Sequence, residues 1–274
     1  MSVFLSNQPV KIFDLLAHAW LRVQARPEML LLLALLAGLM NAVLFAPAFE
    51  LMGQVIETLS TDTDTAQQNT AELVSQGWPT FAWGQLTITL VNAMLLVPWA
   101  RAMAPGGLTP GSGGSSKMFV RSLRAFLHMT LANILLAIML GVGLTVLGAL
   151  ASAVGFLSMV VIFAGVFAMV WAAIALNAAA HFAVLLESVD HPTSLHAAWK
   201  SFGVNARPAT ASLGCLFLVY FMASALMSSL VNGFGIENDR VWLVISGALT
   251  FAVSAIHIAA LTRFIIAKPV DITA

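Results

Sequence analysis

Apolar residues along the chain gather into six long blocks that polar stretches separate. The blocks cover about 29–48, 80–100, 126–148, 155–185, 210–232 and 241–266. Each block reaches the roughly 20 residues that a helix needs to cross the hydrocarbon core of a bilayer. The third and fourth blocks form one run, which we divide within 148–155 because small residues and two glycines there suit a tight hairpin. The pattern predicts an all-α polytopic integral membrane protein, with six transmembrane helices in a single membrane domain over residues 1–274.

Three shorter stretches, 10–26, 117–126 and 193–207, have the spacing of amphipathic helices. In the first, one face carries Ile12, Phe13, Leu16, Trp20 and Val23, and the opposite face carries Lys11, Asp14, His18 and Arg22. We expect three amphipathic helices that lie in the membrane interface. Pro27 and Pro208 are expected to end the first and third, and Thr193 or Ser194 to cap the third.

Basic residues fall almost entirely on one side of this predicted topology. Eleven of the twelve Lys and Arg residues lie in stretches that would share one side, and Arg240 is the exception. The positive-inside rule then places both termini in the cytoplasm of a bacterial inner membrane. Trp20, Trp99 and Trp199 are expected to anchor the chain at the inner interface, together with Arg26 and Arg207.

Composition agrees with a chain that lies mostly in lipid. It is 60% apolar and 9% charged, whereas a soluble domain carries about 25% charged residues. The formal net charge is zero, so no general attraction to nucleic acid is expected. The stretch 50–79 is expected to be an outer loop whose polar, acidic centre could hold a short helix but whose composition suits a mobile segment. The Gly- and Ser-rich stretch 105–116 is expected to be a flexible cytoplasmic linker. The first block is longer than the apolar part of a signal peptide, so we expect an uncleaved signal-anchor.

Several polar side chains enter the apolar blocks, and each needs a hydrogen-bond partner or a function there. Asn41 lies mid-span. Counting helix rise places six others in or near the inner half of the bilayer: Asn92, His128, Asn133, Asn177, His181 and His257. Their side chains serve one of two purposes. They form hydrogen bonds between packed helices, each of which stabilises the packing by about 0.6 kcal/mol, or they line a vestibule that is open to the cytoplasm. Such a vestibule could hold an anionic headgroup, a metal or a haem.

Catalytic and cofactor motifs are absent from the sequence. It contains no H-E-x-x-H, G-x-S-x-G or Cys-x-x-Cys, and no paired-ligand motif for a metal or haem. We therefore expect no enzyme, no catalytic or metal-binding residues, and no cofactor. No Asp, Glu, Lys or Arg lies near the middle of a predicted span, which argues against a proton-driven carrier or an ion pump.

Residues 181–214 carry a resemblance to a known family. A span ends, a short polar turn follows, then Ser194-Leu195-x-x-Ala198-Trp199-x-Ser201, and finally Arg207-Pro208 and a new span. This resembles the six-helix membrane domain fused to some bacterial glycerophosphodiester phosphodiesterases, and its stand-alone, mostly uncharacterised relatives. The resemblance implies the architecture and a bacterial inner-membrane location. It does not imply the phosphodiesterase activity, because the residues of that catalytic domain are not found here.

Two functions remain open from the sequence. The first is a non-enzymatic inner-membrane accessory or assembly protein that acts through protein or lipid contacts. It follows from the lack of a catalytic set, of deep charges and of a soluble domain. The alternative is a carrier or scramblase that moves a lipid or small amphiphile through an inner-leaflet polar vestibule. The expected partners are membrane lipids and, for the first function, another membrane protein, but no nucleic acid.

Overall fold

Helices make up almost all of the structure. The computed structural model describes residues 3–5, 9–60, 66–104, 114–153, 158–233 and 239–267. The helices are α1 (Ile12–Gln24), α2 (Pro27–Leu44), α3 (Ala46–Ser60), α4 (Ala66–Met103), α5 (Gly114–Ala153), α6 (Ser158–Ser188), α7 (Leu195–Ser201), α8 (Ala206–Gly233) and α9 (Asp239–Leu261), with 3-10 turns η2 (Gly203–Asn205) and η3 (Thr262–Phe264). Within these residues, six helical segments are long and apolar enough to cross a membrane. The predicted all-α, multi-pass membrane architecture is confirmed.

Each of the six long segments overlaps one predicted block, although the third begins ten residues and the fifth seven residues before its block. They are Pro27–Leu44, Ser75–Met103, Ser116–Ala153, Ser158–Ser188, Gly203–Val231 and Arg240–Phe264. Pro27 occupies the first turn of α2, where its missing N–H costs nothing. A short antiparallel pairing of β1 (Val3–Leu5) with β2 (Ile265–Ala267) joins the start of the described chain to its last described segment.

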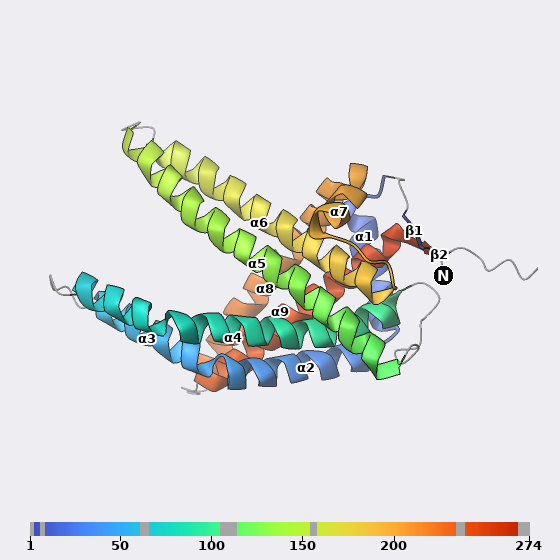
Figure 1. Cartoon of the computed structure of the whole chain (residues 1–274), viewed down its shortest axis with the longest axis horizontal. Helices are drawn as coiled ribbons and strands as arrows, with labels where there is room; N and C mark the ends of the chain where they lie inside the picture. Colours follow the sequence, from blue (N-terminus) through green and yellow to red (C-terminus); the bar gives the residue numbers. More distant parts are fainter. Residues whose placement is uncertain are drawn as a thin grey trace, which may run out of the picture.

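The two ends of the helix bundle differ in how tightly they pack (Figure 1). We call the end that holds Arg101, Arg121 and Arg124 the basic end, and the opposite one the far end. The end of α4, the start of α5, the end of α6, and the short helices α1 and α7 lie at the basic end. From there, the α5–α6 hairpin diverges from α2, α3 and α4 toward the far end (Figure 1).

The buried core lies toward the basic end. Its largest fully buried apolar side chains include Trp99, Phe182, Leu186, Ile258 and Leu261. The far halves of α5 and α6 are instead lined with exposed apolar residues, such as Ile138 at 57% and Phe167 at 71% exposed. In a membrane protein such apolar faces are suited to contact with lipid tails.

Helices α2 and α9 approach each other closely because each contributes a glycine to the contact. A Cβ on Gly38 would collide with the carbonyl oxygen of Val244, and a Cβ on Gly247 would collide with the side chain of Asn41. Small residues at such contacts let two helix backbones approach within van der Waals distance. Asn41 also donates a hydrogen bond from Nδ2 to Leu243 O at 2.8 Å, which links the same two helices.

Two expectations about the connecting stretches are wrong. Residues 117–126 do not form a separate surface helix, because α5 runs through them without a break. Most of 50–79 is helical rather than a mobile loop, since it belongs to α3 and α4; residues 61–65 lie outside the described part. At about 1.5 Å per residue, α5 is about 60 Å long, twice a hydrocarbon thickness of about 30 Å. Residues 105–113 of the predicted linker are likewise not described.

Helices form in the first and third of the predicted amphipathic stretches. The third ends at Ser201, and Pro208 lies within α8, which begins at Ala206, so the expectation that Pro208 ends the third helix is wrong. Helix α1 buries Leu15, Ala19 and Val23, while Phe13 and Trp20 are 83% and 63% exposed. The predicted helical spacing is confirmed, and the face of α1 that carries Leu15 and Ala19 is the one that packs against α8 and α9. Helix α7 begins after Ser194, whose side chain accepts a hydrogen bond from Ala197 N at 3.1 Å, so the predicted cap is confirmed.

Candidate functional site

A polar cavity of about 460 Å³ lies between the diverging helices. Helices α2, α3, α4, α5, α6, α8 and α9 all contribute to its wall. Its polar lining residues are Asn41, Gln85, Thr89, Asn92, Asn133, Asn177, His181, Tyr220, Ser246, Thr250 and Ser254. Among the described residues that line it, none is Asp, Glu, Lys or Arg. The cavity is therefore polar but carries no permanent charge.

The structure brings together four of the six residues predicted to line a vestibule. Asn92, Asn133, Asn177 and His181 all line the cavity, although they come from three helices. His257 lies directly behind His181, with the two Nδ1 atoms 3.0 Å apart, and is fully buried. His128 lies elsewhere, beside Glu187 at the basic end.

Exposure along the lining shows which way the cavity opens. Its floor is buried: Thr89 and His181 are each 5% exposed. Toward the far end the lining includes Met52, which is 42% exposed, and Trp242. Beneath the floor, the packed core around Trp99 and Phe182 fills the basic end. The cavity thus extends toward the far end, whereas the sequence placed the opening of a vestibule at the basic side.

Most polar groups of the cavity have unused hydrogen-bonding capacity. Asn133 Nδ2 donates weakly to Thr89 Oγ1 at 3.3 Å, and Asn177 Nδ2 donates to Ala173 O of its own helix at 2.9 Å. Each of these amides keeps a second N–H and a carbonyl oxygen. Within the described ranges, the side chains of Gln85 and Asn92 make no hydrogen bond. Polar groups held in this way in an apolar surrounding require water or a ligand as partner.

The histidine pair has one consistent arrangement of protons. His257 Nε2 lies 3.1 Å from the carbonyl oxygen of Ala209, which can only accept, so Nε2 carries the proton. Neutral His257 then has an unprotonated Nδ1, to which His181 Nδ1–H donates across 3.0 Å. Neither buried ring contacts a carboxylate among the described residues, which favours the neutral forms of both. His181 Nε2 is consequently an acceptor, and it makes no hydrogen bond within the described residues.

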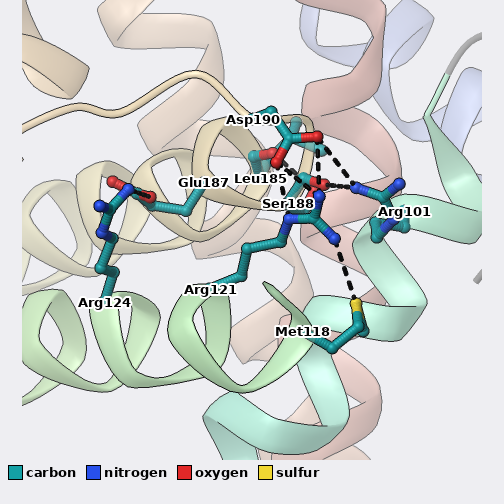
Figure 2. A network of polar contacts seen from close by, with 8 residues as sticks. All are labelled: Arg101, Met118, Arg121, Arg124, Leu185, Glu187, Ser188 and Asp190. Atoms are coloured by element: carbon teal, nitrogen blue, oxygen red, sulfur yellow. Dashed lines mark hydrogen bonds and ion pairs between the residues drawn. The ribbon is translucent and has the colours of Figure 1, made fainter. Parts of the chain in front are cut away.

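A second polar group, at the basic end, is arranged in the opposite way (Figure 2). Asp190 accepts two hydrogen bonds from Arg121, from Nε at 2.7 Å and from Nη2 at 2.8 Å. Arg101 Nη1 donates to Ser188 O at 2.6 Å and lies 3.6 Å from Asp190 Oδ2. Arg101 and Arg121 are 2% and 5% exposed. This network joins α4, α5 and the end of α6.

Glu187 forms the neighbouring half of that network. It is 3% exposed and accepts a hydrogen bond from Thr193 N at 3.1 Å. Arg124 Nη1 lies 3.6 Å from one carboxylate oxygen, and His128 Nε2 lies 3.5 Å from the other. The pattern of apolar and amphipathic stretches did not reveal the burial and pairing of Glu187. The available signal was the recurrence of charged residues at the ends of three neighbouring spans.

Local backbone structure sets the position of Asp190. Helix α6 ends with His191 N bonded to Leu186 O and Asp190 N bonded to Glu187 O, the two hydrogen bonds of a Schellman motif. Asp190 takes the left-handed position of that motif, with φ of 63°. Asp tolerates this conformation better than most residues. The turn directs its carboxylate toward α4 and α5, where Arg101 and Arg121 lie (Figure 2).

One predicted interfacial anchor is wrong. Trp99 is fully buried, and its Nε1 donates to Ala255 O at 2.7 Å, so it belongs to the core of the basic end. Helix α4 continues past Trp99 to Met103, so Trp99 does not lie at the end of its helix, where the interface was expected. Trp20, Trp199, Arg26 and Arg207 are exposed, as an anchoring role requires.

Comparisons with protein-family models, with curated proteins and with solved structures found no match. The resemblance to the membrane domains of glycerophosphodiester phosphodiesterases accordingly stays a prediction. No group of three or more metal-ligating side chains occurs in the part of the chain that the structure describes. The function must therefore be argued from the cavity and the basic-end network themselves.

Proposed function

We propose that this chain is a carrier or scramblase that binds a lipid or small amphiphile in the polar cavity. The single observation that carries the proposal is an uncharged, hydrogen-bonding cavity of about 460 Å³ between helices whose outer faces are apolar and exposed. Ligand pockets usually have volumes of about 300–1,000 Å³. A polar headgroup loses its hydrogen bonds to water inside a bilayer, and this lining would replace them.

The divergence of the α5–α6 hairpin supports a path between the cavity and the lipid. Apolar residues such as Ile134 on α5 and Phe221 on α8 are 51% and 64% exposed. A headgroup held at Asn133 or Thr250 can therefore keep its acyl chain among exposed apolar side chains. Such a separation of headgroup and tail is what a carrier or scramblase needs.

The experiment combines binding and transport on one pair of variants. Thr250 is exposed and lines the cavity midway along α9, so Thr250→Trp should fill it. Phe163, 73% exposed on the outer face of α6, gives the matched control Phe163→Trp. We expect wild type and control to retain an amphiphile in native mass spectrometry and to accelerate movement of a fluorescent lipid across liposomes. Thr250→Trp should lose both. An amphiphile-free wild type with no transport above empty liposomes would rule the proposal out.

We also propose that the protein lies in a bacterial inner membrane with its basic end and both termini in the cytoplasm. The support is the clustering of cations near that end, which the positive-inside rule reads as cytoplasmic. Cysteine labelling in intact cells tests the orientation, with Cys215 replaced by Ala. Glu50→Cys should react with an impermeant maleimide from the periplasm, while Ser116→Cys should not. The reverse pattern would invert the topology.

A second candidate, the non-enzymatic accessory or assembly role, is favoured by the surface of the basic end. Phe13, Trp20 and Trp199 are 83%, 63% and 37% exposed there. Exposed aromatic and cationic side chains suit contact with lipid headgroups or with another membrane protein. A partner that co-purifies in mild detergent and is lost in Trp20→Ala, with no amphiphile in the cavity, would favour this role over the first.

A further inference from the structure

We propose that the occupant of the cavity is an uncharged amphiphile with a hydroxyl headgroup, and that His181 Nε2 accepts the hydrogen bond from that hydroxyl. This inference rests on the proposed function, because it names the class of ligand that the same cavity takes. It is argued from three features: the charge of the lining, the proton arrangement of the histidine pair, and the distribution of apolar side chains.

The lining discriminates against charged headgroups. A phosphate or carboxylate would need an arginine, a lysine or several backbone N–H groups, and an ammonium would need a carboxylate. Among the described lining residues, no side chain of either kind is present. Arg101 and Arg121 lie at the basic end, where Ser188 O and Asp190 engage them. An isolated charge in the cavity would lose its hydration without compensation, whereas a hydroxyl would not.

The proton arrangement then selects a donor. Ala209 O fixes the proton on His257 Nε2, and this in turn makes His181 Nδ1 the donor between the two rings. His181 lines the cavity, and because its Nδ1 is bonded to His257, Nε2 is the ring nitrogen that remains for a ligand. Because Nε2 is an acceptor, its ideal partner is an O–H or N–H group. A hydroxyl can donate to Nε2 and at the same time accept from the second N–H of Asn177, whose side chain lies on the same helix face one turn away.

The rest of the lining suits an alkyl chain. Met40, Phe45 and Phe49 lie toward the far end, and Ile88, Met129 and Phe217 lie nearer the polar floor. A chain that runs from the histidine pair toward the far end would contact these residues and the exposed faces of the diverging helices. The cavity therefore matches a long-chain alcohol or a lipid with a free hydroxyl.

The test uses four probes that share one chain: oleyl alcohol, its methyl ether, oleyl phosphate and oleyltrimethylammonium. Each competes with tritiated oleyl alcohol for the full chain in nanodiscs. We expect the methyl ether, which accepts but cannot donate, to bind about tenfold more weakly than the alcohol. The two charged probes should bind more weakly still. His181→Phe, which keeps a ring of similar size, should remove the preference for alcohol over ether. The exposed His196→Phe is the matched control and should retain it.

A second measurement needs no variant and no ligand. Nitrogen-15 spectra of histidine-labelled protein should show His181 protonated at Nδ1 and His257 at Nε2. A His181 protonated at Nε2 would overturn the inference, and so would equal binding of the alcohol, the ether and the charged probes. In the latter case the amphiphile-binding function would stand and only the ligand class would be wrong. Binding of none of the four probes would overturn both.

Discussion

The basic end and the cavity differ in how their polar side chains are paired. At the basic end Asp190 and Glu187 are paired with arginines, a histidine and a backbone N–H group. In the cavity, Asn92 and Gln85 face open space, and the helices on either side diverge. Both regions lie within the same six helices, so the difference is not one of composition alone.

This contrast indicates a division between a region that holds the fold and a region that is shaped for a ligand. Polar groups that stabilise a structure are satisfied within it, because an unsatisfied buried group costs free energy. Polar groups that line a cavity and have no partner in the described chain are available to water or to a ligand. The predictions below follow from this division: substitutions at the basic end should lower stability, and substitutions in the cavity should lower binding.

Truncation of Trp99 should have the largest effect on stability. The side chain is fully buried and donates to Ala255 O, so Trp99→Ala leaves a void and removes a hydrogen bond between α4 and α9. We expect a loss of about 3–5 kcal/mol in the free energy of unfolding, measured by SDS titration in mixed micelles. Trp171, 41% exposed on α6, provides the control Trp171→Ala, which should change stability little. Equal losses in the two variants would mean that the core is not concentrated at the basic end.

Neutralising Asp190 should have the next largest effect. Asp190→Asn keeps the left-handed turn at φ of 63° but removes the charge that pairs with the 5% exposed Arg121. We expect a loss of about 2 kcal/mol, because a buried guanidinium is left without its carboxylate while Asp190 itself is partly hydrated. Adding Arg121→Met to Asp190→Asn should restore part of that stability, because the double variant no longer buries the unpaired guanidinium of Arg121. The exposed Asp14→Asn on α1 serves as control.

Removing a cavity hydroxyl should hardly affect stability and should reduce binding. Thr89 and Thr145 each donate to a carbonyl one turn back on their own helix, at 2.7 Å and 2.9 Å, but only Thr89 lines the cavity. We expect Thr89→Val to lower stability by about 0.6 kcal/mol, typical of a polar contact between membrane helices. Its retention of the amphiphile in native mass spectrometry should fall several-fold. Thr145→Val should alter neither. A large loss of stability in Thr89→Val would show that the lining is structural.

Titration of His18 should have the smallest effect, and it should be confined to acidic pH. Burial, reinforced by Arg22 and Arg263, holds the pKa of His18 below its usual value near 6.5. Its Nε2 lies 3.0 Å from Thr262 Oγ1, which links α1 to the turn after α9. As pH falls, His18 therefore takes up a proton in the unfolded chain before it does so in the folded chain. The contribution of neutral His18 to the free energy of unfolding is complete above about pH 6.5, and it declines as pH falls toward the lowered pKa. Thermal unfolding of His18→Gln should show a weaker pH dependence in that window than wild type. If His18→Gln leaves the pH dependence of thermal unfolding unchanged, that dependence comes from a titratable group other than His18.

Much of the fold could be predicted from the sequence because lipid imposes a simple rule. A span must be a helix of about 20 apolar residues, so block lengths and loop charges were sufficient to locate all six. Block boundaries failed where a helix continued beyond the membrane. Nothing in residues 117–126 marks a break in α5, and the polar composition of 50–79 does not prevent α3 and α4 from forming.

The candidate site was less accessible to sequence reasoning. Helix spacing shows that Asn177 and His181 share a face, but not which face of α4, α5 or α9 meets it. Those rotations depend on packing details such as Gly38 and Gly247 at the α2–α9 contact. For the same reason the sequence could not show that Asn133 lines the cavity while His128, on the same helix, does not. The bidentate pairing of Arg121 with Asp190 depends on a single left-handed residue, which no hydrophobic pattern reveals.

A density map of the full chain in lipid nanodiscs would test the central claim most directly. The account predicts elongated non-protein density in the cavity, with one end beside His181 and Asn177 and the other reaching past Thr250 toward the far end. It also predicts that the α5–α6 hairpin remains apart from α4 and α9. A closed bundle, in which protein side chains fill the space around Thr250 and no extra density appears, would contradict it.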